Sequence, residues 1–178
     1  MSKTRLYINK KLSSNLMIYV KDKQLHYLKN VLRVKINDKV SLFDSLTGEW
    51  LSKVISINRD NIVLQILKKN REIETESDLW LIFAPHKSLR MNITFQKATE
   101  LGVSRFIPCI TEFTNQSKIN INNLKTNIIE ASEQSERLSL PNLDDSIKLD
   151  QLLEKFPQDR CLVFCNENFK GLPIIYDA

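Results

Sequence analysis

The chain has 178 residues, 42% of them hydrophobic and 26% charged, which is an ordinary composition for a globular protein. No apolar run approaches the roughly 18 residues that a membrane-spanning helix needs, and the N-terminus lacks the apolar core of a signal peptide. We therefore predict a cytoplasmic protein with no membrane partner. Three cysteines without CxxC spacing favour reduced thiols, and the shortage of histidine argues against a metal site.

Charge is divided unevenly along the chain. Residues 1–70 carry 14 Lys and Arg against 5 Asp and Glu, a net of +9. Residues 71–178 carry 12 against 16, a net of −4. A basic half joined to a mildly acidic half favours a polyanion-binding module at the N-terminus, with a surface that only aids solubility as the alternative.

The first 70 residues predict a small β-barrel domain. Turn signals separate five segments that are rich in Val, Ile, Leu and aromatic residues, and we expect these to be strands: 5–8, 17–20, 40–44, 50–57 and 61–67. Thr47-Gly48 marks a hairpin between two of them. One helix interrupts the strands, with Asp22 as its predicted N-cap and Leu25, Leu28 and Leu32 at helical spacing.

Residues 70–78 are polar and acidic, which indicates a linker or a solvated turn. Beyond them, strand and helix patterns alternate and predict an α/β domain with a largely parallel sheet over residues 71–178, so that the whole chain is α+β. The predicted strands are 79–84, buried on both faces, then 105–110 and a buried 161–165 that contains Cys161 and Cys165. The predicted helices are 89–101, ended by Gly102, then 122–138 and 149–156.

Two helical faces carry polar residues. Glu130, Glu133, Gln134 and Arg137 share one side of the helix at 122–138, which taken alone is typical of a solvated face with a Glu133–Arg137 pair. The preceding helix places Ile93, Lys97 and Glu100 together, while Met91, Phe95 and Ala98 face the core.

Only three glycines occur, and no two are close enough to form GxGxxG or a P-loop. An α/β domain without a glycine-rich turn has no ordinary phosphate cradle, which excludes dinucleotide-binding dehydrogenases, P-loop nucleotidases and glycine-loop methyltransferases. The serine-hydrolase motif GxSxG is absent as well.

Four patterns occur together in order: HYLKNVLR at 26–33, LFD at 42–44, QKATELGV at 96–103 and EQSER at 133–137 followed by Pro141. In this order and spacing, the chain resembles the RsmE family of small-subunit ribosomal RNA methyltransferases. The resemblance implies a PUA-like β-barrel that grips RNA, followed by a knotted α/β domain of the SPOUT type. It also implies S-adenosylmethionine as cofactor, a homodimer, and methylation of ring nitrogen 3 of a uridine in 16S ribosomal RNA of the small subunit.

The resemblance and the chemistry together nominate site residues. Ring nitrogen 3 of uridine must lose a proton before it attacks, so the site needs a base or a charge that stabilises the anion. We expect catalytic roles for Arg90, Glu100, Glu133 and Arg137, with either Glu100 or Glu133 as the proton acceptor. We expect RNA contacts from Arg5, His26, Arg33, Lys87 and Lys97.

Some features depart from the family pattern. Full-length relatives continue into a Gly-Pro-Glu-Gly-Gly loop and a Leu-Arg-x-Glu-Thr-Ala segment that form most of the methyl-donor pocket and the knot, and neither occurs in the 178 residues. Asn92, Phe113 and Ser45 stand where the family usually has an acidic residue, Arg and Gly. We therefore expect an incomplete SPOUT domain, truncated or divergent, with Asn166 as its one cofactor contact and weak or no binding of S-adenosylmethionine. The alternatives are a non-catalytic RNA-binding remnant and, less favoured, an interaction scaffold.

Overall fold

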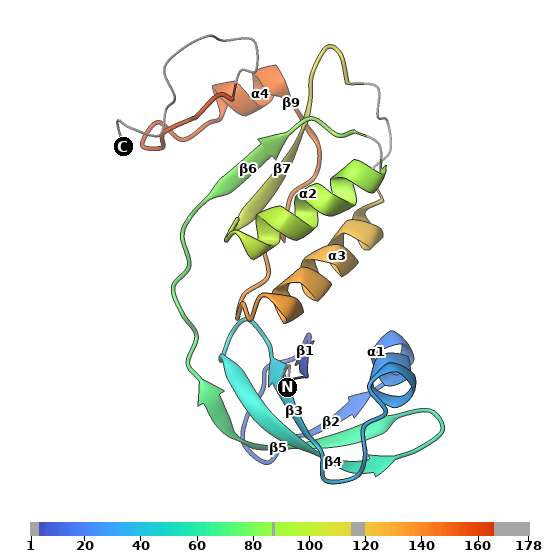
Figure 1. The fold of residues 1–178 in the computed structure, drawn as a ribbon. Coiled ribbons are helices and arrows are strands. Elements are labelled where there is room, and N and C mark those ends of the chain that lie inside the picture. The colour runs from blue at the N-terminus through green and yellow to red at the C-terminus, as the bar shows by residue number, and fades with distance from the viewer. Residues whose placement is uncertain (1–3, 87, 115–119, 166–178) are drawn as a thin grey trace.

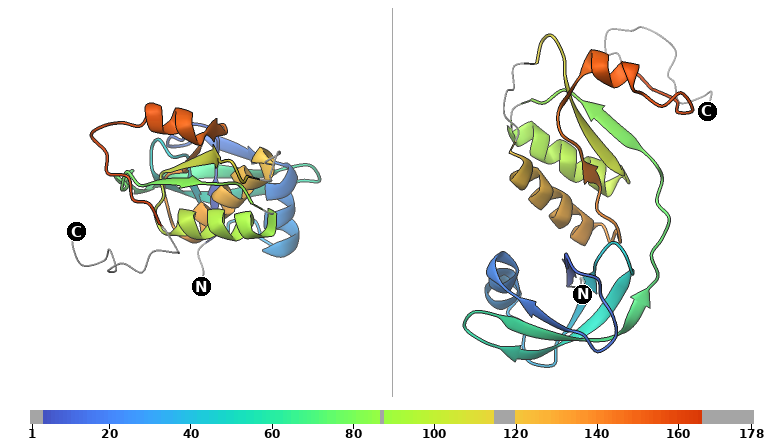
Figure 2. Two further views of the ribbon diagram at one scale, coloured as in Figure 1. Left: turned by 90° about the horizontal axis from the view of Figure 1, so that it is seen from above. Right: turned by 180° about the vertical axis from the view of Figure 1, so that it is seen from behind.

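A computed structural model describes residues 4–86, 88–114 and 120–165. Figure 1 shows two parts joined by an extended segment, and Figure 2 shows the same arrangement from above and from behind. The N-terminal part contains β1 (Arg5–Tyr7), β2 (Met17–Val20), α1 (Asp22–His26), η1 (Tyr27–Val31), β3 (Lys39–Phe43), β4 (Glu49–Ile57) and β5 (Ile62–Arg71). The C-terminal part contains β6 (Trp80–Phe83), α2 (Ser88–Glu100), β7 (Arg105–Ile110), α3 (Ile121–Gln134), β8 (Asn142–Leu143), β9 (Ile147–Lys148) and α4 (Leu149–Glu154).

The five N-terminal strands form one curved sheet in the order β1-β3-β4-β5-β2. All neighbours are antiparallel except β1 and β3, which run parallel. One face of the sheet closes on a core in which residues such as Val40, Leu42, Val54 and Leu64 are fully buried. The five predicted strands are confirmed, because period-two patterning with one buried face specifies both strand and register.

The helix that interrupts the strands differs from its prediction. Lys21 is its N-cap, no side chain caps it, and Asp22 is its first residue with a positive φ of 50°. The prediction of Asp22 as N-cap is therefore wrong. The helix continues as the π-helical turn η1, in which Leu28 reaches the core.

The turn between β3 and β4 is organised by one carboxylate. Asp44 accepts hydrogen bonds from the backbone N–H groups of Leu12, Leu46 and Thr47, and these bonds hold its pKa below its ordinary value although burial opposes them. Ser45 follows with φ of +62° and a buried hydroxyl without a partner, a position that suits glycine better. The predicted hairpin at Thr47-Gly48 is confirmed.

The C-terminal part is a parallel sheet with β7 at its centre, between β6 on one side and β8 and β9 on the other. Helices α2 and α3 cover one face, where Phe95 stacks on Phe106 with ring centroids 4.2 Å apart. Helix α4 covers the other face through Leu152, which packs on Ile107 and Cys109. The predicted α/β architecture is confirmed.

A proline stands in the central strand. Pro108 lies opposite the gap between β8, which pairs with Arg105 and Phe106, and β9, which pairs with Cys109 and Ile110. Because proline has no N–H to donate, the neighbouring strand is interrupted where the ladder would require that donor.

Three predictions for this part are wrong. Strand β6 is half-buried because it forms the edge of the sheet. Residues 161–165 form no strand, and Cys161 and Cys165 are exposed, because the strand propensity of an apolar run depends on its packing context and does not by itself make a strand. Helix α3 ends at Gln134, and Glu136 takes a φ of +59°, so Arg137 leaves the helical face and makes no i,i+4 pair with Glu133.

The segment between the two parts, residues 72–79, has no regular structure, as expected. Among the helices in the described part of the chain, none is long and apolar enough to cross a membrane.

We predict that Gly48→Ala destabilises the protein by about 2–4 kcal/mol. The added Cβ would lie 2.2 Å from the backbone oxygen of Arg71, and φ at Gly48 is +97°. Gly102→Ala is the matched control, because its φ is +94° but its Cβ would meet nothing within 4 Å, so only the left-handed backbone costs about 1–2 kcal/mol. Equal losses in urea denaturation would contradict the clash.

Candidate functional site

A cleft separates the helical faces of the two parts. It has a volume of about 660 Å³ and is lined by residues of α1 and η1 on one side and of α2 and α3 on the other. Its polar lining includes Gln24, Asn92, Gln96, Asn127 and Glu133. Amide groups donate and accept hydrogen bonds in the pattern that base edges present, so this surface suits a nucleobase.

Arg5 joins the two parts at the end of this cleft. Its Nε donates to Glu49 Oε2 at 2.7 Å, and its Nη1 donates to the backbone oxygens of Ser132 and Glu133, each at 3.0 Å. Its Nη2 donates to the backbone oxygen of Arg137 at 2.8 Å. The guanidinium thus satisfies carbonyl groups that the C-terminus of α3 leaves open, where a positive charge is favoured. Arg5 is 5% exposed, so the prediction of an RNA contact there is not supported.

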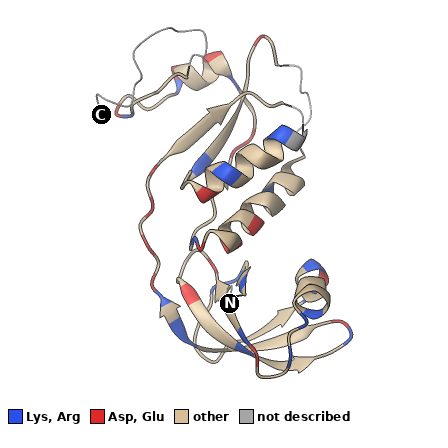
Figure 3. Cartoon of the chain, viewed as in Figure 1, with Lys and Arg blue, Asp and Glu red and all other residues tan. Residues whose placement is uncertain are grey.

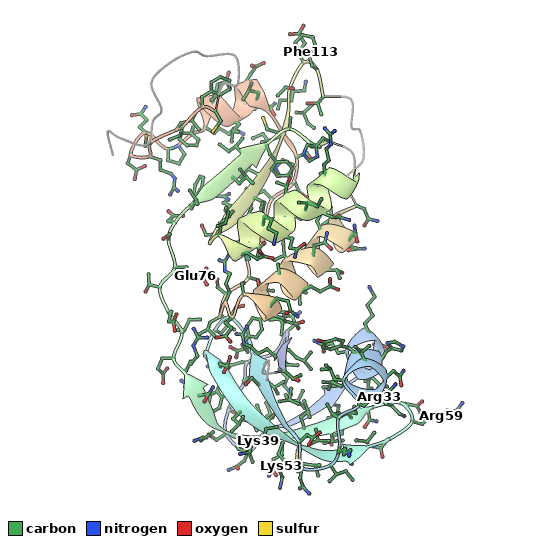
Figure 4. The ribbon with its side chains drawn as sticks, in the orientation of Figure 1. Arg33, Lys39, Lys53, Arg59, Glu76 and Phe113 are labelled. Atoms are coloured by element: carbon green, nitrogen blue, oxygen red, sulfur yellow. The ribbon has the colours of Figure 1, made fainter. Side chains whose placement is uncertain are left out.

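Arg137 likewise donates hydrogen bonds to backbone carbonyl groups at the C-terminal end of helix α2. Its Nη1 donates to the backbone oxygens of Thr99 at 2.7 Å and Val103 at 2.9 Å, and its Nη2 bonds the carboxylate of Glu76. Glu76 belongs to the segment between the two parts, beside the helix ends in Figure 4. Arg137 is 8% exposed and its Nη groups are engaged, so its position is that of a structural clamp and not of the predicted catalytic group.

Glu133 is the predicted site residue that does line the cleft. Its Oε1 accepts the N–H of Tyr7 on β1 at 2.8 Å. Burial raises the pKa of Glu133 to about 7, with a further rise from Glu130, while the Tyr7 N–H and Arg5 act in the opposite direction. A carboxyl with this pKa can accept or donate a proton near neutral pH.

Glu100 has the opposite environment. Lys97 Nζ donates to it at 2.7 Å and Gln96 Nε2 at 3.0 Å, and the hydrogen bond from Lys97 is the main reason why the pKa of Glu100 is lowered. A paired, ionised carboxylate at the surface is a weak base. The geometry therefore favours Glu133 over Glu100 as the proton acceptor.

The remaining nominated residues are not brought into the cleft. Arg90 is exposed on α2, and His26 and Arg33 are exposed on the N-terminal part. Lys97 is held in its surface pair with Glu100. Lys87 and Asn166 lie outside the described residues.

The cleft also contains residues that the sequence did not nominate. Asn92 Oδ1 accepts hydrogen bonds from Asn127 Nδ2 at 2.8 Å and from Asn123 Nδ2 at 3.1 Å, which ties α2 to α3. Gln24 Nε2 donates to the backbone oxygen of Tyr7 at 2.8 Å and so borders the Glu133 carboxyl. The departure of Asn92 from the acidic residue usual in the family was the one sequence feature that pointed to any of these residues.

Comparison with known proteins identifies the class that this architecture defines. Residues 20–67 match the RNA methyltransferase PUA domain, and residues 73–176 match the RNA methyltransferase domain. The chain therefore belongs to the RNA methyltransferase family, in the RsmE group that its motifs predicted.

Its relatives include two proteins called ribosomal RNA small subunit methyltransferase E. That of Rickettsia conorii is 34% identical over 171 residues, which is 96% of this chain and 69% of the relative. That of Buchnera aphidicola subsp. Schizaphis graminum is 31% identical over 149 residues, which is 78% of this chain and 59% of the relative. The chain thus spans between about three fifths and two thirds of these proteins.

A solved structure of the same kind has a similar fold. The ribosomal RNA small subunit methyltransferase E from Neisseria gonorrhoeae, bound to S-adenosyl methionine, superposes with a TM-score of 0.80 at 26% identity. The match covers 88% of this chain and 66% of that one. A methyltransferase from Legionella pneumophila, at 23% identity and a TM-score of 0.73, shows the fold alone.

The parallel sheet indicates where a cofactor would bind. An α/β fold places ligands at the carboxyl edge of its parallel strands, here the segments after β6 and β7. The hydroxyls of Thr111 and Thr114 bond each other there, at 2.9 Å, and Phe113 is 84% exposed. Within the described ranges there is also no group of three His, Cys, Asp or Glu that suits a metal.

Removal of the Arg5 guanidinium should disrupt the contact between the two parts and destabilise the folded protein. Arg5→Ala removes the buried cation that pairs with Glu49, which keeps its hydrogen bond from Asn70, and removes the donor to the α3 carbonyls. We expect a loss of about 3–5 kcal/mol in free energy of unfolding. The control is Lys69→Ala, which breaks the exposed Lys69–Glu72 pair and should cost less than about 1 kcal/mol. A loss of equal size in both variants would show that Arg5 does not hold the structure.

Glu133 should make stability depend on pH. Its pKa is about 7 in the folded protein and 4.5 in the unfolded chain, so its contribution is fully present below pH 4.5 and is lost as pH rises through 7. Glu133→Gln keeps an oxygen for the Tyr7 N–H, and it should be more stable than wild type at pH 8 and should lose this pH dependence. Glu112→Gln, at an exposed position, is the control in thermal unfolding at pH 5.5 and 8. An unchanged pH profile for Glu133→Gln would contradict the raised pKa.

Proposed function

We propose that the chain acts on 16S ribosomal RNA of the small subunit as an S-adenosylmethionine-dependent methyltransferase, and that the methylated atom is ring nitrogen 3 of a uridine. The observation that carries this proposal is the match of both parts of one chain to RNA methyltransferase domains, one of them a PUA domain. The Rickettsia relative and the cofactor-bound Neisseria structure support it. As the family resemblance implies, we infer a cytoplasmic homodimer.

In this proposal the cleft holds the target nucleoside and Glu133 accepts its ring proton. Asn92, Gln96 and Asn127 line the same cleft as Glu133, and the amide atoms that are not used in the bonds described above can hydrogen-bond the base edge. The target base must be unpaired or flipped out to enter a cleft of this kind. Arg90, which is exposed on α2 outside the cleft, would hold a phosphate of the RNA.

A second function is favoured by a specific observation. The net charge of +9 lies in residues 1–70, outside the residues that match the methyltransferase domain. This favours an RNA-binding protein without catalysis as the second candidate, since the positive charge binds RNA without any methyl donor.

One set of measurements separates the two functions. The 178-residue chain is mixed with radiolabelled S-adenosylmethionine and unmethylated 16S ribosomal RNA, and the RNA is digested and analysed by mass spectrometry. Appearance of 3-methyluridine supports the proposed reaction, and a different methylated nucleoside overturns the proposed atom. Salt-dependent RNA binding with no methyl transfer, and no cofactor binding by calorimetry, supports the second function.

Substitutions then test the roles of the cleft residues. Glu133→Gln should lower the rate of methyl transfer by about 100-fold or more, because general-base catalysis contributes about that much. Glu154→Gln, at an exposed position on α4, should leave the rate unchanged. Full activity of both Glu133→Gln and Arg90→Ala would overturn the assigned roles.

A further inference from the structure

Three asparagine side chains form a cluster between α2 and α3. Asn92 Oδ1 accepts hydrogen bonds from Asn127 Nδ2 at 2.8 Å and from Asn123 Nδ2 at 3.1 Å. An amide oxygen has two acceptor sites, so both are occupied and the orientation of the Asn92 amide is fixed. Asn92 and Asn127 are half-buried and line the cleft, whereas Asn123 is exposed and does not line it.

The cluster leaves one donor and one acceptor unused at the cleft. Among the hydrogen bonds of the described residues, none uses Asn92 Nδ2 or Asn127 Oδ1. These two atoms belong to amide groups that are joined by the 2.8 Å bond, so they lie beside each other. An acidic residue at position 92, as is usual in the family, would offer only acceptors, and the asparagine adds the donor.

The surroundings of this pair suit a neutral ligand group. The three asparagines carry no charge, and the charged residues of the cleft wall formed by α2 and α3 are Glu130 and Glu133. Figure 3 shows acidic residues on α3, toward its end that faces the N-terminal part. A phosphate is disfavoured on an acidic wall, while a hydroxyl is not.

The distance to Glu133 decides which part of a nucleoside can reach the pair. Glu133 follows Asn127 by six residues on α3, which is about 9 Å along the axis at a rise of about 1.5 Å per residue. A base edge that is bonded to Glu133 is too short to span this length, but a nucleoside continues from its base into its sugar. The cleft volume of about 660 Å³ accommodates a nucleoside.

We propose that Asn92 and Asn127 form a ribose-recognition subsite for the 2′-hydroxyl of the nucleoside in the cleft. Asn92 Nδ2 donates to the hydroxyl oxygen, and Asn127 Oδ1 accepts the hydroxyl hydrogen, so that a single group satisfies both free atoms. The 2′-hydroxyl is the group that distinguishes RNA from DNA. This inference rests on the proposed function in placing a uridine in the cleft. It assigns the two asparagines to the sugar, while Gln96 and Glu133 remain with the base.

The test compares nucleosides that differ in one hydroxyl. Uridine, 2′-deoxyuridine and 3′-deoxyuridine are titrated separately into the ¹⁵N-labelled 178-residue chain, and their dissociation constants are measured by NMR. We expect 2′-deoxyuridine to bind about tenfold more weakly than uridine, because its absence of a hydroxyl leaves the donor and the acceptor unpaired. We expect 3′-deoxyuridine to bind like uridine, because the subsite holds the other hydroxyl.

A substitution then ties the preference to the subsite. In Asn92→Leu, which has a side chain of similar shape without the amide, the ratio of the two dissociation constants should fall below about twofold. Asn122→Leu is the matched control, because Asn122 is exposed on the same helix and does not line the cleft, and it should keep the tenfold ratio. Circular dichroism checks that both variants are folded.

A second measurement needs no folded variant. The side-chain amide signal of Asn92 is identified by its absence from the spectrum of Asn92→Leu, and in wild type it should shift with uridine but not with 2′-deoxyuridine. Equal affinity of wild type for uridine and 2′-deoxyuridine would overturn the subsite, as would an unmoved Asn92 signal or no binding of uridine at millimolar concentration. A tenfold ratio that persists in folded Asn92→Leu would overturn the role of Asn92.

The outcomes separate this inference from the proposed function. A preference for uridine over 2′-deoxyuridine that depends on Asn92, together with no methyl transfer to 16S ribosomal RNA, supports the subsite and overturns the proposed reaction. Methyl transfer by wild type with equal binding of the two nucleosides overturns the subsite and leaves the proposed reaction standing.

Discussion

Two buried arginines hold this molecule together. Burial of a guanidinium is costly unless its donors are satisfied, and the last carbonyl groups of a helix are costly to bury unless they find donors. Arg5 donates hydrogen bonds to the last carbonyl groups of α3, and Arg137 donates to carbonyl groups at and just after the end of α2. The backbone oxygen of Arg137 accepts from Arg5, so the two clamps form one continuous network.

The properties of the cleft depend on this network. Arg5 holds the end of α3 against the N-terminal sheet, which brings the Glu133 carboxyl within 2.8 Å of the Tyr7 N–H and buries it. Burial raises the pKa of Glu133, while the Tyr7 N–H and Arg5, which meet it across the contact, act to lower it. Protonation of Glu133 and the packing of the two parts are for this reason physically coupled.

The two ends of the N-terminal sheet serve different purposes. At the junction, Glu49 is buried and paired with Arg5, and Phe43 packs beneath the same guanidinium. At the opposite end, Lys39 and Lys53 oppose each other, and neither has an acidic partner among the ion pairs of the described residues. One strand pair therefore carries a closed ion pair at one end and open positive charge at the other. This arrangement suits a domain that is fixed to its neighbour and binds a large polyanion.

The sequence by itself determined the five N-terminal strands, the alternation of strand and helix from β6 to α3, and the family, but not the short strands β8 and β9. These follow from local periodicity, turn residues and short motifs, each of which depends on nearby residues only. It also located the excess of positive charge. It could not place Asp22 or residues 161–165 correctly, since a left-handed residue and a missing strand partner are set by surrounding structure.

Only the tertiary structure decided what the charged residues do. Glu133 lies 128 residues after Arg5, and Arg137 lies 132 residues after it. No sequence spacing shows that these three residues meet. Two arginines that looked suited to RNA or catalysis are buried caps, and one of two equivalent glutamates acquired a pKa of about 7. The physical reason is that burial and hydrogen bonding across the fold, and not residue type, set the charge and the reach of an ionisable side chain.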